Sequence, residues 1–393
     1  MSKRYQGGVL GVGFNPLRAP NAPTIGTATA GGNNCASVPF TAPACVGGSA
    51  ITGYTARSAP AGFSGTAAAS PFAVTGLTSC TSYTFGVFAL NSYGPSPSSA
   101  FSNSITAVLD GTFGIFALGN GSTTRNKYTY SSNTNAVATA SSVGSNYASA
   151  AGNSTRGIFV IGRLGAVAQT TRNKYTYSSD TSGSATGASI ASCSGAATGN
   201  STVGIFALGA DCQSCLYYST RDKYTYSGDT VAAGGSATAA SYTGSAAGNS
   251  TTGIFALGSS AAGAPLTTRN KYTYSGDAVA AGGAATTGSY RGSAAGNSTL
   301  GIFALGYPTS GVRNKYVYSG CVVSAATSTI AGTLACFGAA AGNSTVGIFT
   351  LGICSGAREK YTYSSCVVSS ATASSGTSRA GAAASNGIAG VTL

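Results

Sequence analysis

The sequence contains no histidine, no tryptophan and one methionine, and only 7% of its 393 residues are charged. Without histidine the chain cannot form a Ser-His-Asp or Cys-His catalytic arrangement, or a metal site with a histidine ligand. Its seven carboxylates share no local motif, although a glycosidase needs only two. No glycine-rich phosphate loop is present. We predict that the protein is not an enzyme, and we expect no cofactor and no metal site.

Long hydrophobic runs are also absent. No stretch reaches the roughly 18 apolar residues of a membrane span, so we expect no membrane insertion. The first residues, MSKRYQGGVLGVGF, place basic residues before an apolar patch, as a signal peptide does. The patch is interrupted by Gly11 and Gly13 and followed by Pro16 rather than by a small-residue cleavage site. We expect no signal peptide, which argues against sugar attachment at the Asn-Ser-Thr triplets.

Small residues dominate what is present. The chain has 58 glycines, together with 22 tyrosines and 15 phenylalanines that recur at regular intervals. Disordered chains lack such aromatic residues and carry more charge. Tyrosine, threonine and glycine in this pattern favour short strands joined by tight turns. We predict an all-β protein.

Two sequence markers define an internal repeat of about 47 residues. The marker RNKYTYS begins at Arg125, Arg172, Arg221, Arg269, Arg313 and Arg358. The marker GIFALG begins at Gly114, Gly157, Gly204, Gly253, Gly301 and Gly347. Both markers count six units within residues 109–393, and a truncated copy follows from Gly381.

Each unit has room for four short strands. In NKYTYS, Tyr272 and Tyr274 face one way, while Lys271, Thr273 and Ser275 face the other. A four-stranded unit of this length is the size of a propeller blade, so we predict a six-bladed β-propeller over residues 109–393, with seven blades as the alternative. The copy from Gly381 would complete the first unit and close the ring. A solenoid is a second alternative, but it would need caps at both ends.

Two positions of the repeat indicate turns. Asn-Ser-Thr occurs at Asn153, Asn200, Asn249, Asn297 and Asn343, where one strand is expected to turn into the next. Asp180, Asp229 and Asp277 share one position, which is Asn133 in the first unit and Cys321 and Cys366 in the last two. An aspartate that alternates with asparagine is typical of a turn rather than of a catalytic acid.

The order of elements within a unit resembles the kelch repeat. A hydrophobic strand ending in glycine, a tyrosine-bearing strand and a Ser/Ala-rich return follow one another throughout residues 109–393. The chain departs from the kelch pattern in having one glycine where that family has two, and in lacking its tryptophan. The resemblance implies a kelch-like β-propeller.

Residues 19–108 do not repeat and read as successive strands of an antiparallel sandwich. This segment resembles a fibronectin type III domain, and Tyr83 matches the tyrosine corner of that family. The resemblance rests on Leu77, Tyr83, Phe85, Val87, Ala89, Asn91 and Gly94. It implies a spacer or interaction module.

Residues 1–18 form an apolar arm that carries Val9, Leu10, Val12, Phe14 and Leu17. One interpretation is a frayed terminus. The other, which we favour because of its apolar content, is an anchoring arm that docks on another protein by strand addition.

Twelve of the 20 basic residues belong to the Arg-x-Lys-Tyr motifs of the repeat. These are Arg125, Lys127, Arg172, Lys174, Arg221, Lys223, Arg269, Lys271, Arg313, Lys315, Arg358 and Lys360. In a propeller they would form a basic rim. The rim could consist of strand-edge charges that keep the surface soluble, or it could capture an anionic polymer such as a bacterial-surface glycan. We do not expect nucleic-acid binding, because no nucleic-acid motif accompanies the charges.

Repeat register predicts pairs among the ten cysteines. Cys193 and Cys336 precede their GIF motifs by equal distances, and Cys212 and Cys354 follow theirs at similar ones, so we predict the disulfides Cys193–Cys212 and Cys336–Cys354. Cys35 and Cys80 fall at one end of the fibronectin-like module and form a third candidate pair. The alternative is buried free thiols. The single Cys212-x-x-Cys215 motif is weak support for zinc, because no second pair accompanies it.

The order of segments in this chain resembles that of bacteriophage virion proteins, including tail fibres, baseplate appendages and capsid decorations. The segments are the arm, the fibronectin-like module and the small-residue propeller. The resemblance implies a structural protein that is assembled in the host cytoplasm and exposed on the particle. It implies partners among other virion proteins through the arm, a possible homo-oligomer, and adhesion to host-surface glycan or protein through propeller loops. A purely structural decoration or cement protein is the alternative, and a secreted bacterial lectin-like adhesin is a second one.

Overall fold

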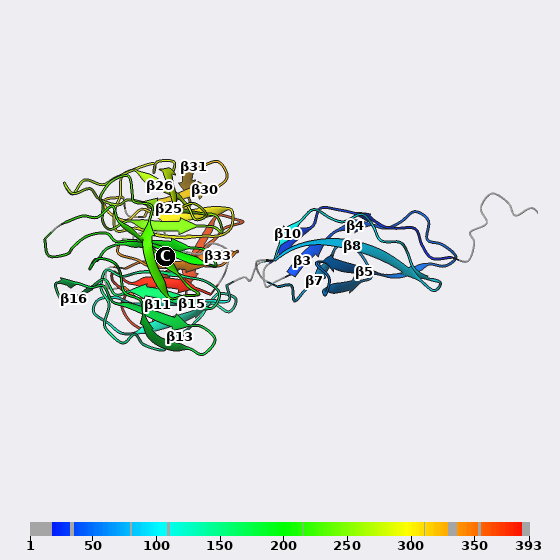
Figure 1. Ribbon diagram of the computed structural model, residues 1–393, viewed down its shortest axis with the longest axis horizontal. Coiled ribbons are helices and arrows are strands. Elements are labelled where there is room, and N and C mark those ends of the chain that lie inside the picture. Colours follow the sequence, from blue (N-terminus) through cyan, green and yellow to red (C-terminus); the bar gives the residue numbers. More distant parts are fainter. Residues whose placement is uncertain are drawn as a thin grey trace, which may run out of the picture. The chain divides into compact units, whose positions relative to one another are not determined.

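The computed structural model describes residues 18–31, 35–78, 81–107, 111–214, 216–309, 311–328, 336–352 and 355–386 (Figure 1). These ranges form strands and turns without a helix, so none of them contains a helix that could cross a membrane. The chain divides into two compact units, Met1–Leu109 and Asp110–Leu393. The division lies one residue from the boundary that the start of the repeats predicts. The apolar residues of the arm lie outside the described residues.

The first unit is built from short antiparallel strands in three sheets. One sheet pairs β1 (Thr24–Ile25) with β4 (Phe40–Thr41), and another has the order β2 (Thr29–Gly31), β3 (Cys35–Val38), β7 (Phe72–Val74). The third has the order β10 (Ile105–Thr106), β8 (Ser82–Asn91), β5 (Ile51–Ala59), β6 (Ser64–Ala67), with β9 (Gly94–Pro95) paired to β8.

Strand β8 supplies much of the core of this unit. Its alternate residues Tyr83, Phe85, Val87 and Ala89 are all buried in one apolar cluster, as a period of two requires. The hydroxyl of Tyr83 accepts a hydrogen bond from the backbone N–H of Thr78 at 3.2 Å. This is the backbone contact that the tyrosine-corner prediction requires.

The described residues of the second unit form six four-stranded antiparallel sheets. Sheet 1 has the order β13 (Thr134–Ala138), β12 (Arg125–Thr129), β11 (Phe113–Ala117), β36 (Ala382–Ser385). Sheet 2 comprises β14 (Ser149–Gly152), β15 (Arg156–Val160), β18 (Arg172–Thr176) and β19 (Thr181–Ala185). Sheet 3 comprises β20 (Ala196–Gly199), β21 (Val203–Ala207), β22 (Arg221–Thr225) and β23 (Thr230–Gly234).

The remaining sheets follow the same order along the chain. Sheet 4 comprises β24 (Ser245–Gly248), β25 (Thr252–Ala256), β26 (Arg269–Thr273) and β27 (Ala278–Ala281). Sheet 5 comprises β28 (Ser293–Gly296), β29 (Leu300–Ala304), β30 (Arg313–Val317) and β31 (Val322–Ala326). Sheet 6 comprises β32 (Ala340–Gly342), β33 (Val346–Thr350), β34 (Arg358–Thr362) and β35 (Val367–Ala371), and a small separate ribbon pairs β16 (Arg163–Leu164) with β17 (Val167–Ala168).

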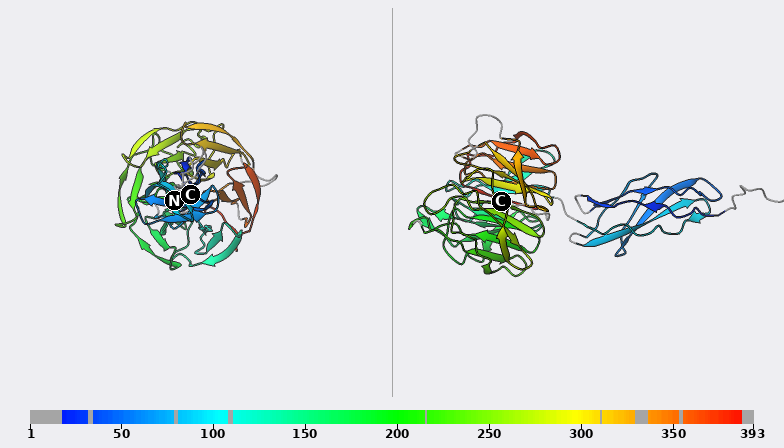
Figure 2. Two further views of the ribbon diagram at one scale, coloured as in Figure 1. Left: turned by 90° about the vertical axis from the view of Figure 1, so that its right-hand side faces the viewer. Right: turned by 90° about the horizontal axis from the view of Figure 1, so that it is seen from above.

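Sheet 1 is assembled from both ends of the second unit. Its strand β36, the truncated copy from Gly381, pairs with β11 in the register Ile115 to Ala384. The left view of Figure 2 shows the sheets placed side by side around a central axis. The truncated copy therefore supplies the strand that the first repeat lacks.

Each apolar core of this unit lies between two neighbouring sheets. In every GIF motif the isoleucine and the phenylalanine point to opposite neighbours: Ile158 packs with sheet 3 and Phe159 with sheet 1. Phe116 of sheet 1 packs with Ile348 of sheet 6, so the last sheet has a core with the first. Tyr272 and Tyr274 lie in the same cluster, as their alternation predicts. One repeat cannot bury its apolar residues alone.

The glycine of the GIF motif permits this close packing. A Cβ atom at Gly157 would lie 2.9 Å from the Cβ of Ala384 on the neighbouring sheet, and one at Gly253 would lie 2.5 Å from Cγ2 of Thr198. Neither approach is possible for real side chains. The abundance of glycine and alanine thus follows from the spacing of the sheets.

Candidate functional site

The predicted basic rim is wrong for its six arginines. Arg125, Arg172, Arg221, Arg269, Arg313 and Arg358 are all at most 2% exposed. Each guanidinium lies over the GIF phenylalanine of the next sheet, for example Arg221 over Phe255 at 4.5 Å from Cζ to the ring centroid. The planar, weakly hydrated guanidinium is suited to such stacking. The arginines therefore join sheets and cannot capture a polymer.

A hydrogen bond completes each junction between neighbouring sheets. The arginine of one sheet donates it to the residue that follows the arginine of the next sheet. Arg221 Nη2 donates to Asn270 Oδ1 at 3.0 Å. In two junctions the acceptor is a carboxylate: Arg172 pairs with Asp222 at 2.7 Å and Arg313 with Glu359 at 2.5 Å. Burial lowers the pKa of Arg221 to about 10, and the same cause acts on Arg125, Arg269 and Arg358.

The six lysines of the motif are partly buried rather than freely displayed. Lys174 pairs with Asp229 at 3.1 Å, and Lys223 pairs with Asp277 at 2.8 Å. In the first repeat the ammonium of Lys127 lies 4.2 Å from the centroid of the Phe113 ring. These three lysines therefore contact groups of the protein itself, which favours a structural role for them over a role in a binding rim.

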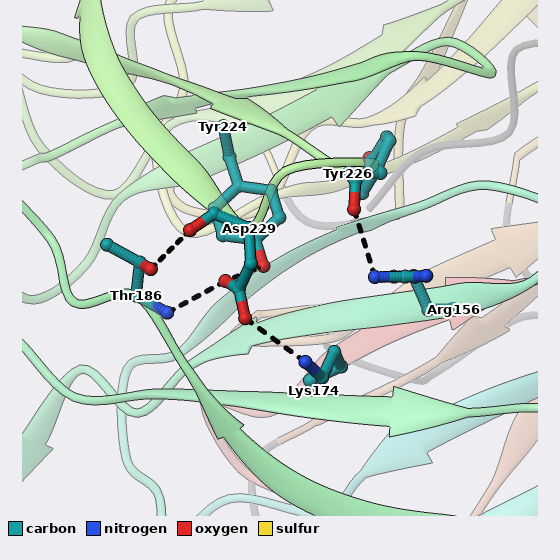
Figure 3. Close-up of polar contacts among 6 residues, drawn as sticks. All are labelled: Arg156, Lys174, Thr186, Tyr224, Tyr226 and Asp229. Atoms are coloured by element: carbon teal, nitrogen blue, oxygen red, sulfur yellow. Dashed lines mark hydrogen bonds and ion pairs between the residues drawn. The ribbon is translucent and has the colours of Figure 1, made fainter.

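The aspartate position is a turn, as predicted. Asn133, Asp180, Asp229, Asp277, Cys321 and Cys366 all have positive φ angles, between 50° and 54°. Figure 3 shows how Asp229 links two sheets: its carboxylate accepts from the Thr186 N–H at 2.9 Å, from the Tyr224 hydroxyl and from Lys174. Arg156 adds a hydrogen bond to the carbonyl of Tyr226 at 2.9 Å.

The environment of Asp229 keeps it ionised. Burial alone would raise its pKa, but the Thr186 N–H, the Tyr224 hydroxyl and Lys174 together lower that pKa to about 2. Burial and the Asp229 carboxylate raise the pKa of Tyr224, so this hydroxyl stays a donor. The arrangement has a negative acceptor and fixed donors, and the described side chains that bond to Asp229 include no second carboxylate.

The Asn-Ser-Thr triplets form the corners that the sequence predicts. Asn249 Oδ1 accepts from the backbone N–H groups of Thr251 and Thr252 at 3.0 and 2.9 Å. Its Nδ2 donates to the carbonyl of Ser298, in the corner of the next sheet, at 3.2 Å. Asn343 makes the corresponding bond to the carbonyl of Gly111 at 3.0 Å. The triplet is therefore both a turn and a link between repeats.

Cys193 and Cys212 form a disulfide with a Cα–Cα distance of 6.2 Å, the pairing that repeat register predicts. The Cys336–Cys354 prediction does not hold at Cys336, which is a buried free thiol, and Cys354 lies outside the described residues. The local pairing differs: Cys193 pairs antiparallel with Ala210, whereas Cys336 pairs parallel with Gly352. The predicted partner of Cys35, Cys80, also lies outside the described residues, as does Cys215.

The end of the six-sheet unit opposite the Asn-Ser-Thr corners has a ring of varied side chains. Six equivalent positions, just before the first strand of each sheet, have positive φ angles of 51–62°. They carry Tyr147, Ser194, Thr243, Arg291, Phe337 and Ala380, six different residues. We call these six the mouth residues. Non-glycine residues rarely adopt this conformation, and it is costly for a β-branched residue such as Thr243.

The mouth residues are held by backbone hydrogen bonds that pass from sheet to sheet. The N–H of Ser194 donates to the carbonyl of Tyr147 at 2.9 Å, and the N–H of Thr243 donates to Ser194 at 2.7 Å. The series continues around the ring, and the N–H of Ala148 donates to Ala380 at 3.2 Å. All six residues line one central cavity of about 60 Å³. A constant backbone frame thus carries six different side chains, of which Tyr147, Arg291 and Phe337 are partly exposed and the other three are buried.

The loops after the GIFALG strands lie at the same end. Backbone bridges join these loops to the residues beside the mouth positions, for example Tyr242 with Ser259 and Tyr290 with Tyr307. These loops contain large apolar side chains that are exposed: Leu164, Val167, Leu216, Tyr307 and Val312 are 38–57% exposed. The chain enters the unit at the other end, where Thr112 donates to Asn386. We call the end with the mouth residues and these loops the loop face.

Arginines and aromatic rings meet on the loop face. Tyr147 and Phe337 pack edge to face with ring centroids 5.6 Å apart. Arg163 lies 4.4 Å from the Tyr147 ring, and Arg291 lies 4.4 Å from the Phe337 ring. Within the described ranges neither arginine forms an ion pair, and the buried Nε of each has no hydrogen-bond partner.

A hollow of about 210 Å³ opens beside the central cavity. Its wall includes Tyr147, Arg163, Cys193, Asp211, Cys212, Tyr217, Tyr242 and Arg291. Tyr217 and Tyr242 pack with ring centroids 4.7 Å apart. The Ser214 hydroxyl and the Gln213 N–H lower the pKa of Asp211. The wall of the hollow thus combines two cations, one carboxylate and several aromatic surfaces. No cluster of three or more metal-ligating side chains occurs in the ranges that the structure describes.

The sequence predicted adhesion through the loops but did not single out the mouth residues. The signal was in the repeat alignment: the two positions that end at each mouth residue read NY, CS, YT, YR, CF and RA, while the strand that follows keeps small residues, as in SAAG, AATG and AAAS. Variable residues beside a strand of small residues resemble a turn that tolerates substitution. Only the positive φ angles and the shared cavity identify them as one ring.

No protein-family model and no curated protein matches the chain. Among solved structures, the crystal structure of domains A168-A170 from titin is similar at 28% sequence identity, with a TM-score of 0.21. The match covers 23% of this chain and 32% of the titin chain. This chain therefore spans about a third of that structure.

Proposed function

We propose that the six-sheet unit is a closed six-bladed β-propeller of kelch-like type, and that the first unit is a fibronectin type III-like sandwich. Three contacts support closure: the pairing of β36 with β11, the stacking of Arg358 on Phe116, and the bond from Asn343 to Gly111. The hydrogen bond between Thr78 and Tyr83 supports the sandwich assignment.

We propose further that the protein is a non-enzymatic structural protein of a bacteriophage particle that adheres to host-surface glycan or protein through its loop face. One observation carries the adhesion proposal: six backbone-equivalent positions on the loop face bear six different side chains, just before first strands that keep only small residues. Variable side chains and loops carried by a rigid scaffold are typical of a recognition surface. Exposed apolar side chains in the adjoining loops support the same reading.

A binding assay with the full chain tests this proposal. Fluorescently labelled protein is incubated with a panel of bacterial strains, and the triple variant Leu164→Ser, Val167→Ser, Leu216→Ser is compared with the natural protein. We expect at least a tenfold loss of cell binding. The control variant Val322→Ser, Val367→Ser removes valines of similar exposure from the outer strands β31 and β35, and it should bind normally.

The alternative of a decoration or cement protein makes a different prediction in the same assay. In that case the natural protein binds no cells but binds phage particles that lack it. Equal loss of cell binding in the loop variant and in the outer-strand control would contradict the loop face as the binding surface.

A further inference from the structure

We propose that the hollow between Arg163, Arg291 and the Tyr217–Tyr242 pair binds a single acidic sugar residue, a sugar ring that bears a carboxylate or a phosphate. This inference deepens the proposed adhesion function, on which it rests for its biological role. It names the ligand class and the side chains that recognise it.

The size of the hollow restricts the ligand. Its volume is about 210 Å³, less than the roughly 300–1,000 Å³ of pockets that take drug-sized molecules. A group the size of one sugar ring fits this limit, and the rest of a longer chain would extend over the exposed loops. The site would therefore recognise one residue of a polymer at a time.

The charges of the hollow favour an anion. Arg163 and Arg291 form no ion pair in the described ranges, and Asp211 is the one carboxylate in the wall. The buried arginines of the repeat differ in that each donates to a side chain of the next sheet, a carboxylate for Arg172 and Arg313 and an asparagine for the other four. The planar fork of arginine matches carboxylate and phosphate oxygens with paired hydrogen bonds. Two such forks that contact aromatic rings but no carboxylate in the described ranges can each bind an acid group from outside.

The aromatic side chains favour a sugar over a small inorganic ion. Tyr217, Tyr242 and Tyr147 present ring surfaces beside the two cations. Tyrosine combines an apolar face with a polar hydroxyl, which suits a ligand with apolar C–H faces and hydroxyl edges. Asp211 adds an ionised acceptor for a sugar hydroxyl.

The disulfide fixes one wall of the hollow. Cys193 and Cys212 both line it, and Cys193 directly precedes the mouth residue Ser194. Backbone bridges join Cys193 to Ala210 and Ala210 to Tyr217. The bond therefore ties the Asp211 loop and Tyr217 to the rigid mouth, which reduces the ordering cost of binding.

Titration calorimetry on the full chain tests the proposal. The probes are a galacturonic acid trisaccharide, the neutral galactose trisaccharide and galactose 6-phosphate, and a glutamate-rich peptide is the acidic control without a sugar. We expect at least one acidic probe to bind at least tenfold more tightly than the neutral one, and the better acidic probe distinguishes carboxylate from phosphate. Arg163→Gln and Arg291→Gln should each weaken acidic binding at least tenfold, and Tyr242→Ala should weaken it as well.

Controls separate binding from folding. Arg57→Gln removes one positive charge from the first unit and should leave affinity unchanged. Thermal unfolding confirms that each variant folds, and Arg291→Lys, which keeps the charge but loses the planar fork, replaces Arg291→Gln if that variant unfolds. Equal affinity for acidic and neutral probes, no effect of either arginine variant, or tighter binding of a glutamate-rich peptide would each overturn the proposal.

The cell-binding assay distinguishes this proposal from the adhesion function. If Arg163→Gln and Arg291→Gln retain full cell binding, the hollow is not the recognition site although the protein is an adhesin. If acidic sugars bind in an arginine-dependent manner while no cells are bound, the hollow is a sugar site and the adhesion function is wrong.

Discussion

The guanidinium of Arg358, in the last repeat, lies over the ring of Phe116, in the first, with Cζ 4.6 Å from the ring centroid. It also donates to Asn126 Oδ1 at 3.3 Å. The same pair of contacts joins neighbouring repeats inside the chain, as for Arg221 with Phe255 and Asn270. The first two residues of the Arg-x-Lys-Tyr motif thus encode a junction between sheets, and the last junction connects the two ends of the unit.

Two equivalent arginines should differ in their importance for stability. Arg172→Met leaves the buried Asp222 carboxylate without its cation, so we expect a loss of about 3 kcal/mol or more in the free energy of unfolding. Arg221→Met leaves only the neutral Asn270, and we expect a loss of about 1–2 kcal/mol. Urea unfolding of both variants measures the difference.

The double variant Arg172→Met, Asp222→Asn provides the control. The junction between sheets 2 and 3 then has methionine and asparagine, as the junction between sheets 3 and 4 has in Arg221→Met. The free energy of unfolding of the double variant should therefore rise to that of Arg221→Met. If Arg172→Met and Arg221→Met lose equal stability, the buried ion pair has no special role.

Asp229 should make the protein less stable in acid. Its folded pKa of about 2 lies below the usual value of 3.8, so its contribution is complete above pH 4 and is lost as the pH falls from about 4 to 2. Since Lys174 and Asp229 are 29% and 31% exposed, solvent screening limits the effect to about 1 kcal/mol.

The variant Asp229→Asn measures this contribution. Asn133 occupies the equivalent turn in the first repeat with a φ of 53°, so asparagine is compatible with the backbone. Denaturant unfolding at pH 7 and pH 2 should show that the variant loses stability at pH 7 and that most of this difference has disappeared at pH 2. A loss of the same size at both values would show that the carboxylate charge is irrelevant.

The corner asparagines should be required for stability. Asn249→Ala removes the acceptor of two backbone N–H groups and the donor to Ser298, and we expect a loss of about 2 kcal/mol. Asn249→Asp retains the acceptor and loses only the donor, so it should cost about half as much. Thermal unfolding compares the two, and equal losses would assign the effect to the Ser298 link alone.

Reduction should weaken the loop face. The Cys193–Cys212 bond spans 19 residues, for which loop-closure entropy gives about 3 kcal/mol. Peptide mapping without reductant should recover these two cysteines linked and Cys336 as a thiol that is alkylated only after unfolding. In the variant Cys193→Ser, Cys212→Ser, hydrogen exchange should accelerate in residues 210–217. Unchanged exchange there would mean that the loop is held by other contacts.

Much of the fold could be predicted because the same sequence pattern occurs in every repeat. Two markers in each repeat predict six units, and the structure has six four-stranded sheets. The turn at Asp229 and the corner at Asn249 were predictable because both depend on short-range backbone hydrogen bonds. The rim prediction failed because sequence gives the charge of Arg221 but not its burial.

The sequence by itself determined the local structure: strands of alternating residues, tight turns at fixed positions, and a truncated copy able to complete the first repeat. Only the tertiary structure decided what each position faces. Neighbouring sheets pack so closely that the arginines are buried, and the hydrogen bonds around the mouth bring Tyr147, Arg291 and Phe337 together although they are far apart in the chain. Those contacts depend on sheet-to-sheet packing, which residue spacing along one chain does not specify.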